Sequence, residues 1–333
     1  MREVVVTVRE EGQRLDHFLA KYLDHEPKGF FYKMLRKKNI VLNGKKAVGK
    51  ERLKTGDRIR LYLSEQTIEK FRTSTAAEGE NREPFSFPEE FHGLSVIYED
   101  EQILVVNKPA GVLSQKAKAE DVSLVEWLQA YLSEELGAQN VFKAGICNRL
   151  DRNTTGLVVS GKTVAALQYL NRLFKERELK KYYLCLVKGN VEKEQRIEGY
   201  LSKSERNNQV TVSKHQAENA VWIETAYSPK EHFMWKGKAY TLLCVHLITG
   251  RPHQIRAHLA SIGHPVIGDL KYGEKEEAFL FRKDFGVRYQ LLHAWKLVLS
   301  QAEYLPEKYH GTEWTAPLPE QFEAVLIKIR EET

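Results

Sequence analysis

Residues 148–162, NRLDRNTTGLVVSGK, place a polar turn directly before a strand-like run. The run GLVVSGK contains β-branched residues between glycines, a pattern typical of a β-strand. Before it, a single acid, Asp151, lies between Arg149 and Arg152 and is followed by Thr-Thr-Gly. The stretch therefore predicts a lone carboxylate at a strand end, beside a tight turn.

Strand-like and helical segments alternate on both sides of this stretch, from Leu94 onward. Helical periodicity marks residues 123–136, 163–177, 253–262 and 318–331. The strand-like runs outnumber them: ILVVNKP, GLVVSGK, YYLCLVKG, VTVS, AVWIETAYS and YTLLCVHLITG. Their uneven spacing and strand-after-strand order predict an α+β fold, a mixed, largely antiparallel sheet with flanking helices, rather than a doubly wound parallel sheet.

The N-terminal part of the chain predicts a separate small unit. Apolar stripes at helical spacing occur in RLDHFLAKYL and FFYKMLRKK, so two short helices come first. IVLNGKKA follows as a strand with an Asn43-Gly44 turn, and LKTGDRIRLYL supplies a further strand. We predict three parts: a helix-and-hairpin unit in residues 1–64, a polar linker in 65–93 and a larger domain in 94–333.

Positive charge is concentrated in the first of these parts. Residues 1–64 hold 16 Lys and Arg against 8 Asp and Glu, whereas residues 94–333 hold 32 against 30. A basic unit of this kind suits a polyanion partner, because lysine and arginine bind phosphates and release counterions. From charge alone, a merely solvated lysine-rich surface is about as good an explanation.

Composition narrows the class of protein. No run of eighteen apolar residues occurs, and no apolar segment follows the charged start MREVVVTVREEGQR, so we expect a cytoplasmic protein without a membrane partner. The three cysteines, Cys147, Cys185 and Cys244, are scattered and lack CxxC spacing. They argue against a disulfide framework and against a structural zinc site.

The lone Asp151 does not identify a site by itself, because an acid at such a turn is more often a backbone cap than a catalyst. A second cluster, LITGRPHQIRAHLASIGHPVIGDLKYG at 247–273, strengthens the case. Helical spacing puts His253 and Arg256 on one face after a strand and a turn. The histidines lack the HExxH zinc pattern, and the glycines form no nucleotide-binding loop, so we expect neither metal nor cofactor.

Two further segments complete the set. EDEQILVVNKPAGVLSQ at 99–115 is a strand stopped by a Lys-Pro-Ala-Gly turn. In LKKYYLCLVKG, either Tyr182 or Tyr183 faces inward, and a core tyrosine with a satisfied hydroxyl is the simpler explanation.

In this order, the four segments resemble the RluA-type pseudouridine synthase family over residues 94–299. RLDRNTTGL resembles the family's signature around its catalytic aspartate, and GRPHQIRAHLASIGHPVIGD resembles its later signature, with NKPAG and LLHA also in place. Asn148 stands where many members have His, and Pro252 where many have Thr. The N-terminal unit, with MLRKKNIVLNGKK, resembles the S-four RNA-binding module that precedes this domain in the family.

The resemblance implies isomerisation of uridine to pseudouridine in structured ribosomal or transfer RNA. The target base is flipped out of the RNA, and no metal or cofactor is needed. The family's catalytic aspartate corresponds to Asp151, held charged by Arg256, and its active-site tyrosine corresponds to Tyr183, which stacks on the base and can help remove the proton from carbon 5. RNA is the expected partner, not DNA, and a monomer suffices. The implied RNA-binding residues are Arg149, which fills the space left by the base, and Arg14, Lys28, Arg36, Lys37, Lys38, Lys45 and Lys46.

Two alternatives belong to other classes. A non-catalytic RNA-binding or ribosome-assembly protein would use the same positive surface as a clamp. A carboxylate-dependent hydrolase of nucleosides or sugars would usually show two cooperating acids, and only Asp151 stands out in the sequence.

Overall fold

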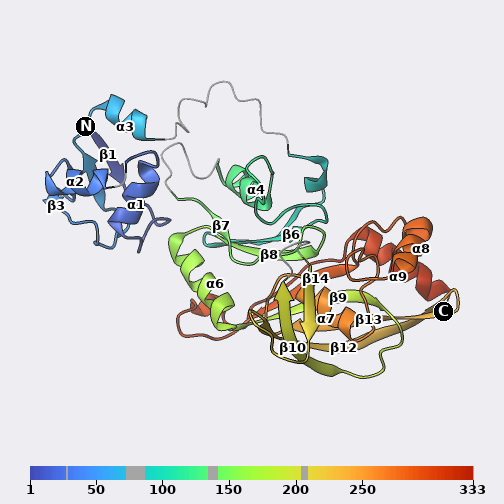
Figure 1. Ribbon diagram of the computed structural model, residues 1–333. Helices are drawn as coiled ribbons and strands as arrows, with labels where there is room; N and C mark the ends of the chain where they lie inside the picture. The colour runs from blue at the N-terminus through green and yellow to red at the C-terminus, as the bar shows by residue number, and fades with distance from the viewer. Residues whose placement is uncertain (28, 73–86, 134–141, 204–208, 333) are drawn as a thin grey trace.

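The computed structural model describes residues 1–27, 29–72, 87–133, 142–203 and 209–332. Within these ranges the strands form two sheets, one of four strands near the N-terminus and one of eleven strands in the rest of the chain (Figure 1). No helix of the described residues is long and apolar enough to cross a membrane.

The four-stranded sheet and its helices form the N-terminal unit, drawn in blue in Figure 1. Its elements are β1 (Arg2–Val5), α1 (Leu15–Tyr22), α2 (Phe30–Arg36), β2 (Ile40–Leu42), β3 (Lys45–Lys46) and β4 (Arg58–Leu61). The apolar stripe of α1 is buried on this sheet, as the sequence predicts. Asn43 and Gly44 have φ of 51° and 73°, so β2 and β3 are joined by the left-handed turn that matches the twist of a hairpin.

The N-terminal unit extends past the predicted boundary at residue 64. Residues Glu65–Phe71, predicted as linker, form helix α3, whose N-terminus is capped by the Ser64 side chain. Ile68 is 0% exposed and belongs to the same core as α1, and the rings of Phe30 and Phe71 lie 4.8 Å apart. The linker prediction is therefore wrong for this helix, while its segment 73–86 lies outside the described residues.

Structure also resumes before the predicted start of the second domain at residue 94. A 3₁₀ turn, η1 (Glu89–Phe91), buries Phe91 in the core of the large sheet. The polar, acidic composition of residues 65–93 concealed both short elements, because each has few apolar side chains to bury.

The large sheet is mixed and largely antiparallel, which confirms the predicted α+β fold. Its strand order is β11-β10-β12-β13-β9-β14-β8-β6-β5, with β15 beside β14 and β7 beside β8. Among the described strands, β14 pairs with β8 in parallel and the other pairs are antiparallel. The strands are β5 (Ser95–Glu99), β6 (Ile103–Lys108), β7 (Gly145–Ile146), β8 (Thr155–Gly161), β9 (Leu179–Lys188), β10 (Gln195–Lys203), β11 (Val210–Ser213), β12 (Val221–Trp235), β13 (Lys238–Leu247), β14 (Leu292–Leu299) and β15 (Glu313–Thr315).

Helices flank the sheet. All four predicted helices are present among the described residues, as α4 (Leu124–Tyr131), α6 (Val164–Glu176), α7 (Gln254–Ser261) and α9 (Glu320–Glu331), while residues 134–136 of the first prediction lie outside the described residues. A further helix, α8 (Lys275–Phe285), was not predicted, because it is rich in charged residues and buries only Ala278 and Phe281 from its apolar set. A second 3₁₀ turn, η2 (Glu307–Tyr309), follows β14.

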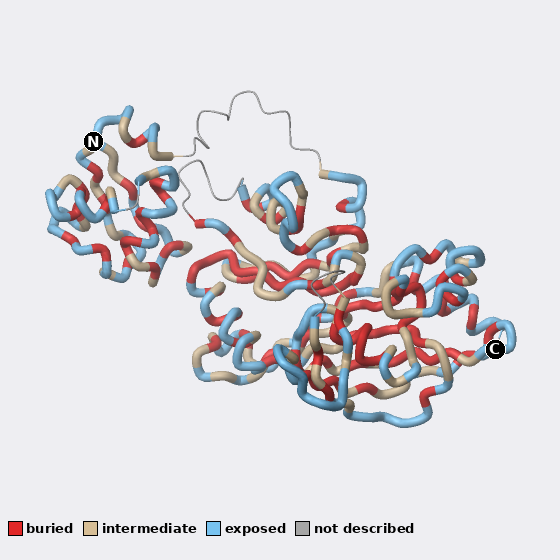
Figure 2. Tube along the Cα trace, in the orientation of Figure 1, coloured by how far each residue is buried: buried red, intermediate tan, exposed pale blue. Residues whose placement is uncertain are grey.

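The two faces of β9 lie in different cores. Tyr183, Cys185 and Val187 share a core with α4 and α7, whereas Leu184 and Leu186 pack with α8 and α9. This alternation follows from the two-residue period of a strand. Figure 2 shows the buried residues running along the central strands. Tyr183 is therefore placed on the α7 side of the sheet.

Strands β8 and β14 approach each other very closely at Gly156. A Cβ atom at Gly156 would lie 2.3 Å from the carbonyl oxygen of Ala294, and Gly156 has a φ of +112°. One residue earlier, the hydroxyl of Thr155 is hydrogen-bonded to Nδ1 of His293 at 2.8 Å. Only glycine fits this position. The Thr-Thr-Gly and Leu-Leu-His-Ala motifs therefore contact each other where β8 pairs with β14.

Candidate active site

Asp151 and Arg256 meet although 105 residues separate them in the chain. Nη1 of Arg256 donates a hydrogen bond of 2.9 Å to Oδ2 of Asp151. The pair lies in a cavity of about 860 Å³ that is also lined by Tyr183, His253 and Arg149. A cavity of this size is within the usual range for small-molecule sites.

The Asp151 side chain does not cap its own turn. Asp151 lies in a loop ahead of β8 rather than at a strand end, and the turn is closed by its main-chain oxygen, which accepts from the N–H of Thr154 at 3.0 Å. This geometry removes the backbone-cap explanation, because the carboxylate is directed to Arg256.

The Lys-Pro-Ala-Gly turn after β6 holds the Asp151 loop. Nζ of Lys108 donates to the carbonyl oxygens of Pro109, Val112 and Arg152 at 2.9, 2.8 and 2.9 Å. Gly111 and Arg152 are joined in both directions, through Gly111 N to Arg152 O at 3.1 Å and Arg152 Nε to Gly111 O at 2.8 Å. Arg152, the residue after the acid, is thus held through both its main chain and its side chain.

Lys108 is fully buried beside these carbonyls, with 0% of its surface exposed. Burial lowers the pKa of Lys108 to about 7, while the charge of Asp151 opposes the shift. The three carbonyl acceptors match the three N–H bonds of an ammonium group and favour its charged form. Lys108 is thus a buried cation that joins two loops, a role the sequence did not reveal.

Two polar side chains hold the segment before Asp151 in place: the hydroxyl of Ser114 and the amide of Asn148. The hydroxyl of Ser114 donates to Leu150 O at 2.9 Å and accepts from Leu150 N at 3.0 Å. Asn148 bridges to β8, since its Nδ2 donates to Leu157 O at 3.1 Å and its Oδ1 accepts from Val159 N at 2.8 Å. Asn148, which differs from the usual histidine, here satisfies main-chain groups at the edge of β8.

Arg256 is held from behind by a second acid, Asp269. Nε and Nη2 of Arg256 donate to Oδ2 and Oδ1 of Asp269 at 2.7 and 2.8 Å, a two-pronged ion pair. Asp269 is 1% exposed and also accepts from the N–H groups of Lys271 and Tyr272 at 2.8 and 3.1 Å. The planar guanidinium is thereby oriented with its third nitrogen toward Asp151.

The charges around Arg256 decide its ionisation. Burial by itself lowers the pKa of Arg256, but the hydrogen bonds and charges of Asp269 and Asp151 outweigh burial and raise the pKa above its ordinary value. The site therefore contains a permanent cation. The sequence prediction placed Arg256 here and missed Asp269, although the Gly-Asp pair at the end of the signature was a signal.

His253 lies at the start of α7 in the left-handed conformation, with a φ of 57°. Its Nδ1 is hydrogen-bonded to the Tyr272 hydroxyl at 2.8 Å. Burial lowers the pKa of His253, although the negative charge of Asp151 opposes the shift. His253 and Arg256 line the same cavity, as their predicted spacing requires, and the imidazole is mainly neutral near pH 7.

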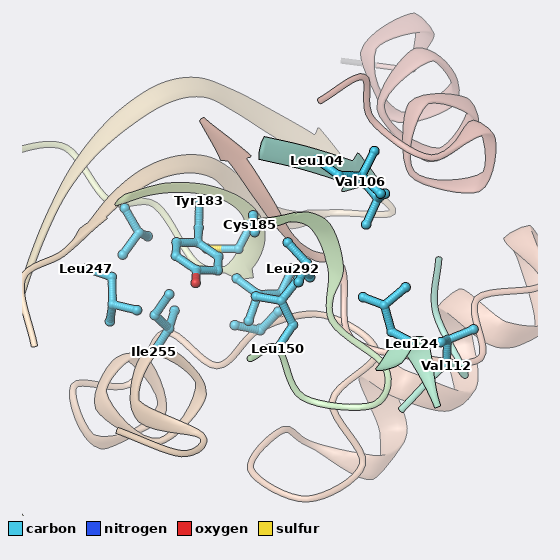
Figure 3. Packing of buried hydrophobic residues seen from close by; sticks show 14 of the residues in the cluster. Leu104, Val106, Val112, Leu124, Leu150, Tyr183, Cys185, Leu247, Ile255 and Leu292 are labelled. Carbon is cyan, nitrogen blue, oxygen red and sulfur yellow. The ribbon is translucent and has the colours of Figure 1, made fainter. Parts of the chain in front are cut away.

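Tyr183, not Tyr182, faces this cavity. Figure 3 shows the Tyr183 ring among Leu150, Leu247, Ile255 and Leu292, which belong to the same core. Burial, and then the negative charge of Asp151, raise the pKa of Tyr183, so its phenol is protonated at neutral pH.

Tyr182 faces the opposite side of β9. Its ring stacks on His246 with centroids 4.9 Å apart. The alternative that the sequence left open is therefore decided in favour of Tyr183.

The remaining predicted residues divide into three groups. Arg149 is exposed at the cavity, with its Nη1 3.4 Å from Oε1 of Gln115. Arg14 is engaged by the Asp16 carboxylate, at 3.1 Å from Nε to Oδ1 and 2.5 Å from Nη2 to Oδ2, and Lys28 lies outside the described residues. The other predicted basic residues are exposed at the end of α2, in the turn after it and on the β2–β3 hairpin: Arg36, Lys37, Lys38, Lys45 and Lys46.

The cavity offers anionic and cationic side chains but few metal ligands. In the part of the chain that the structure describes, no group of three or more His, Cys, Asp or Glu side chains is arranged to hold a metal ion. The acid and the arginine instead pair with each other in a cavity that Tyr183 also lines.

Known proteins are similar to this chain in sequence. The family model of RNA pseudouridylate synthases matches residues 102–261, which include Lys108, Asp151, Tyr183 and Arg256. Ribosomal large subunit pseudouridine synthase D of Nitrosomonas europaea is 32% identical over 332 residues, covering 98% of this chain and 88% of that protein. Ribosomal large subunit pseudouridine synthase C of Escherichia coli is 28% identical over 336 residues, covering 98% and 96%.

The fold is shared as well. The structure of human RNA pseudouridylate synthase domain containing 1 is 26% identical and superimposes with a TM-score of 0.52, covering 74% of this chain and 98% of that chain. Sequence similarity along nearly the whole chain and a common mixed sheet lead to one conclusion. The chain belongs to the RluA-type family of RNA pseudouridine synthases.

Proposed function

We propose that Asp151 is the catalytic group of this pseudouridine synthase and that its substrate is ribosomal RNA. The observation that carries the proposal is the 2.9 Å contact between Asp151 and Arg256 in a cavity large enough for a nucleoside. The names of the relatives favour large-subunit ribosomal RNA over transfer RNA as the substrate.

The reaction breaks the bond between the base and the ribose, turns the base and joins it again through carbon 5. An ionised carboxylate can attack as a nucleophile or accept a proton from the sugar. Burial opposes an ionised acid unless a cation compensates. Arg256 supplies that cation at a fixed position, because Asp269 holds its other two nitrogens.

Tyr183 is proposed as the platform for the target base. Its side chain lines the same cavity as Asp151, and aromatic rings stack on extruded bases. Because its pKa is raised, the phenol enters the reaction protonated, which favours stacking and hydrogen bonding over removal of the proton from carbon 5.

Extrusion of a base from a folded RNA costs a few kcal/mol, so the enzyme benefits from a side chain that occupies the vacated space. Arg149 is the candidate, because it is exposed at the cavity, two residues before the proposed catalytic acid. Its planar guanidinium can stack on the neighbouring bases and hydrogen-bond to their edges.

The N-terminal unit is proposed as an S-four RNA-binding module, followed by a linker and by a catalytic domain that extends to the C-terminus. Its support is the exposed basic surface on α2 and the β2–β3 hairpin, where no ion pair neutralises the five cations within the described chain. Such a surface binds the RNA backbone with little sequence preference.

The test is an Asp151→Asn variant incubated with unmodified large-subunit ribosomal RNA transcript, followed by mapping of pseudouridine. We expect the wild-type protein to form pseudouridine and the variant to form none, while both bind the transcript. Pseudouridine formation by the variant at the wild-type rate would show that Asp151 is not catalytic. Binding without modified nucleosides in either protein would favour the non-catalytic alternative.

A further inference from the structure

The wall of the cavity next to Tyr183 is cationic. Lys181 precedes Tyr183 by two residues on β9, so both side chains lie on the same face of the strand, about 7 Å apart along it. Lys181 lines the same cavity as Asp151, and Arg177 and Arg251 line it nearby. Asp151 already has Arg256 as its partner, so these three cations are additional to the catalytic ion pair.

Lys181 is partly buried without a compensating acid. Burial and, to a smaller extent, the positive charge of Arg177 lower the pKa of Lys181 to about 8. Among the residues that the structure describes, no carboxylate forms an ion pair with Lys181, Arg177 or Arg251. Three neighbouring cations without an acid destabilise the free protein, and a bound anion removes that repulsion.

The ammonium group of Lys181 lies close to the main chain at Gly250. A Cβ atom at Gly250 would lie 3.2 Å from Nζ of Lys181, so a larger residue there would crowd the ammonium group. Arg177 ends helix α6 in the left-handed conformation, with a φ of 61°, which turns the chain directly into β9. Arg251 follows Gly250 and is exposed, as is Arg177.

We propose that Lys181, flanked by Arg177 and Arg251, binds a backbone phosphate of the RNA next to the nucleotide whose base lies on Tyr183. The proposal rests on the proposed function and deepens it, since it assigns a phosphate subsite to the cavity. Phosphate contacts fix the register of a nucleic acid on a protein, whereas base contacts select the sequence. This subsite positions the strand so that the target ribose reaches Asp151.

The variant that tests the subsite is Lys181→Met, which keeps the length of the side chain and removes its charge. Lys180→Met is the matched control, because Lys180 is exposed and occupies the alternate position of the same strand. Lys181→Arg restores the charge. Binding of each protein to unmodified large-subunit ribosomal RNA transcript is measured across a salt series, and KM and kcat for pseudouridine formation are measured on the same transcript.

We expect Lys181→Met to weaken binding about tenfold and to lower the slope of log Kd against log salt by about 0.7 to 1, the loss of one phosphate contact. KM rises with it. Lys180→Met should match the wild type, and Lys181→Arg should recover most of the loss. A wild-type salt slope in Lys181→Met, or a fall in kcat alone, would overturn the proposal.

The measurements of binding and of activity distinguish a failure of this proposal from a failure of the proposed function. If the wild type forms no pseudouridine, the proposed function fails, and the salt slope still tests the phosphate subsite. If Lys181→Met does not fold, the double variant Arg177→Gln with Arg251→Gln removes two exposed cations of the same cluster, and an unchanged salt slope in that variant rejects the subsite.

Discussion

Nζ of Lys108 lies 2.9 Å from the carbonyl oxygen of Arg152, although 44 residues separate them. The contact joins the turn after β6 to the residue that follows Asp151. Because Lys108 also donates to Pro109 and Val112, a single buried ammonium group fixes the distance between the two loops. The position of the proposed catalytic acid therefore depends on a residue that does not touch the substrate cavity.

The first prediction concerns this ammonium group. Lys108→Met should lower the free energy of unfolding by about 3 kcal/mol, because the carbonyl groups of Pro109, Val112 and Arg152 lose the hydrogen bonds of the ammonium group. Denaturant unfolding measures the change. Lys118→Met, at an exposed position after the same turn, should change stability by less than about 0.5 kcal/mol. Equal effects of the two substitutions would contradict a joining role for Lys108.

The second prediction concerns Asp269. Asp269→Asn should lower the free energy of unfolding by about 3 kcal/mol, because it leaves a buried guanidinium without its two-pronged partner. It should also reduce kcat about 100-fold, since a small displacement of the reacting groups has an effect of that size, while RNA binding persists. Asp284→Asn, which breaks the exposed Lys236–Asp284 pair, serves as the control. If the Asp269→Asn variant had the kcat of the wild type, catalysis would not depend on Asp269 to orient Arg256.

The third prediction concerns pH. Burial lowers the pKa of His293 to about 4, from an ordinary value of 6.5. Between these values the unfolded chain binds a proton that the folded chain does not, so stability falls as pH falls from 6.5 toward 4. His293 should contribute about 2 kcal/mol to the loss between pH 6.5 and 5. Denaturant unfolding at pH 7.5, 6.5 and 5 measures it.

The control for this prediction is His293→Gln, which cannot take up the proton. Its loss of stability between pH 6.5 and 5 should be shallower than that of the wild type. Some loss should persist, because burial also lowers the pKa of His258 to about 4. Parallel pH profiles for the wild type and the variant would rule out His293 as a source of the acid sensitivity.

The fourth prediction concerns the N-terminal unit. The double variant Lys45→Gln with Lys46→Gln removes two exposed cations from the β2–β3 hairpin. The slope of log Kd against log salt for ribosomal RNA should fall by about 1.4 to 1.8, because two phosphate contacts are lost. Lys275→Gln with Lys283→Gln on α8 makes the same charge change at exposed positions elsewhere. If both pairs lower the slope equally, the hairpin has no special role.

The sequence predicted the α+β fold and placed Asp151, Tyr183 and Arg256 in one cavity, because each lies in a segment whose resemblance to the family is specific. It missed Asp269 and Lys108. Their roles depend on where a turn brings a charged group, and no periodicity in the sequence reports that.

Two helices, α3 and α8, were not predicted from the sequence for a similar physical reason. Helix α3 buries mainly Ile68, and α8 has charged residues around few apolar ones, so neither shows a clear apolar stripe. Both helices form because neighbouring segments supply the rest of the core. Tertiary contacts, rather than local propensity, decide such helices.

The contacts that hold Asp151 and the residues after it come from segments spread over much of the chain: Lys108 binds Arg152, Arg256 binds Asp151 and His293 binds Thr155. A polypeptide emerging from the ribosome acquires Asp151 long before its guanidinium partner and the strand that closes against Gly156. The nascent protein therefore has no assembled centre until β14 has been synthesised. RNA isomerisation by this chain therefore requires that Arg256 and β14 have been synthesised and have packed against the Asp151 loop and β8.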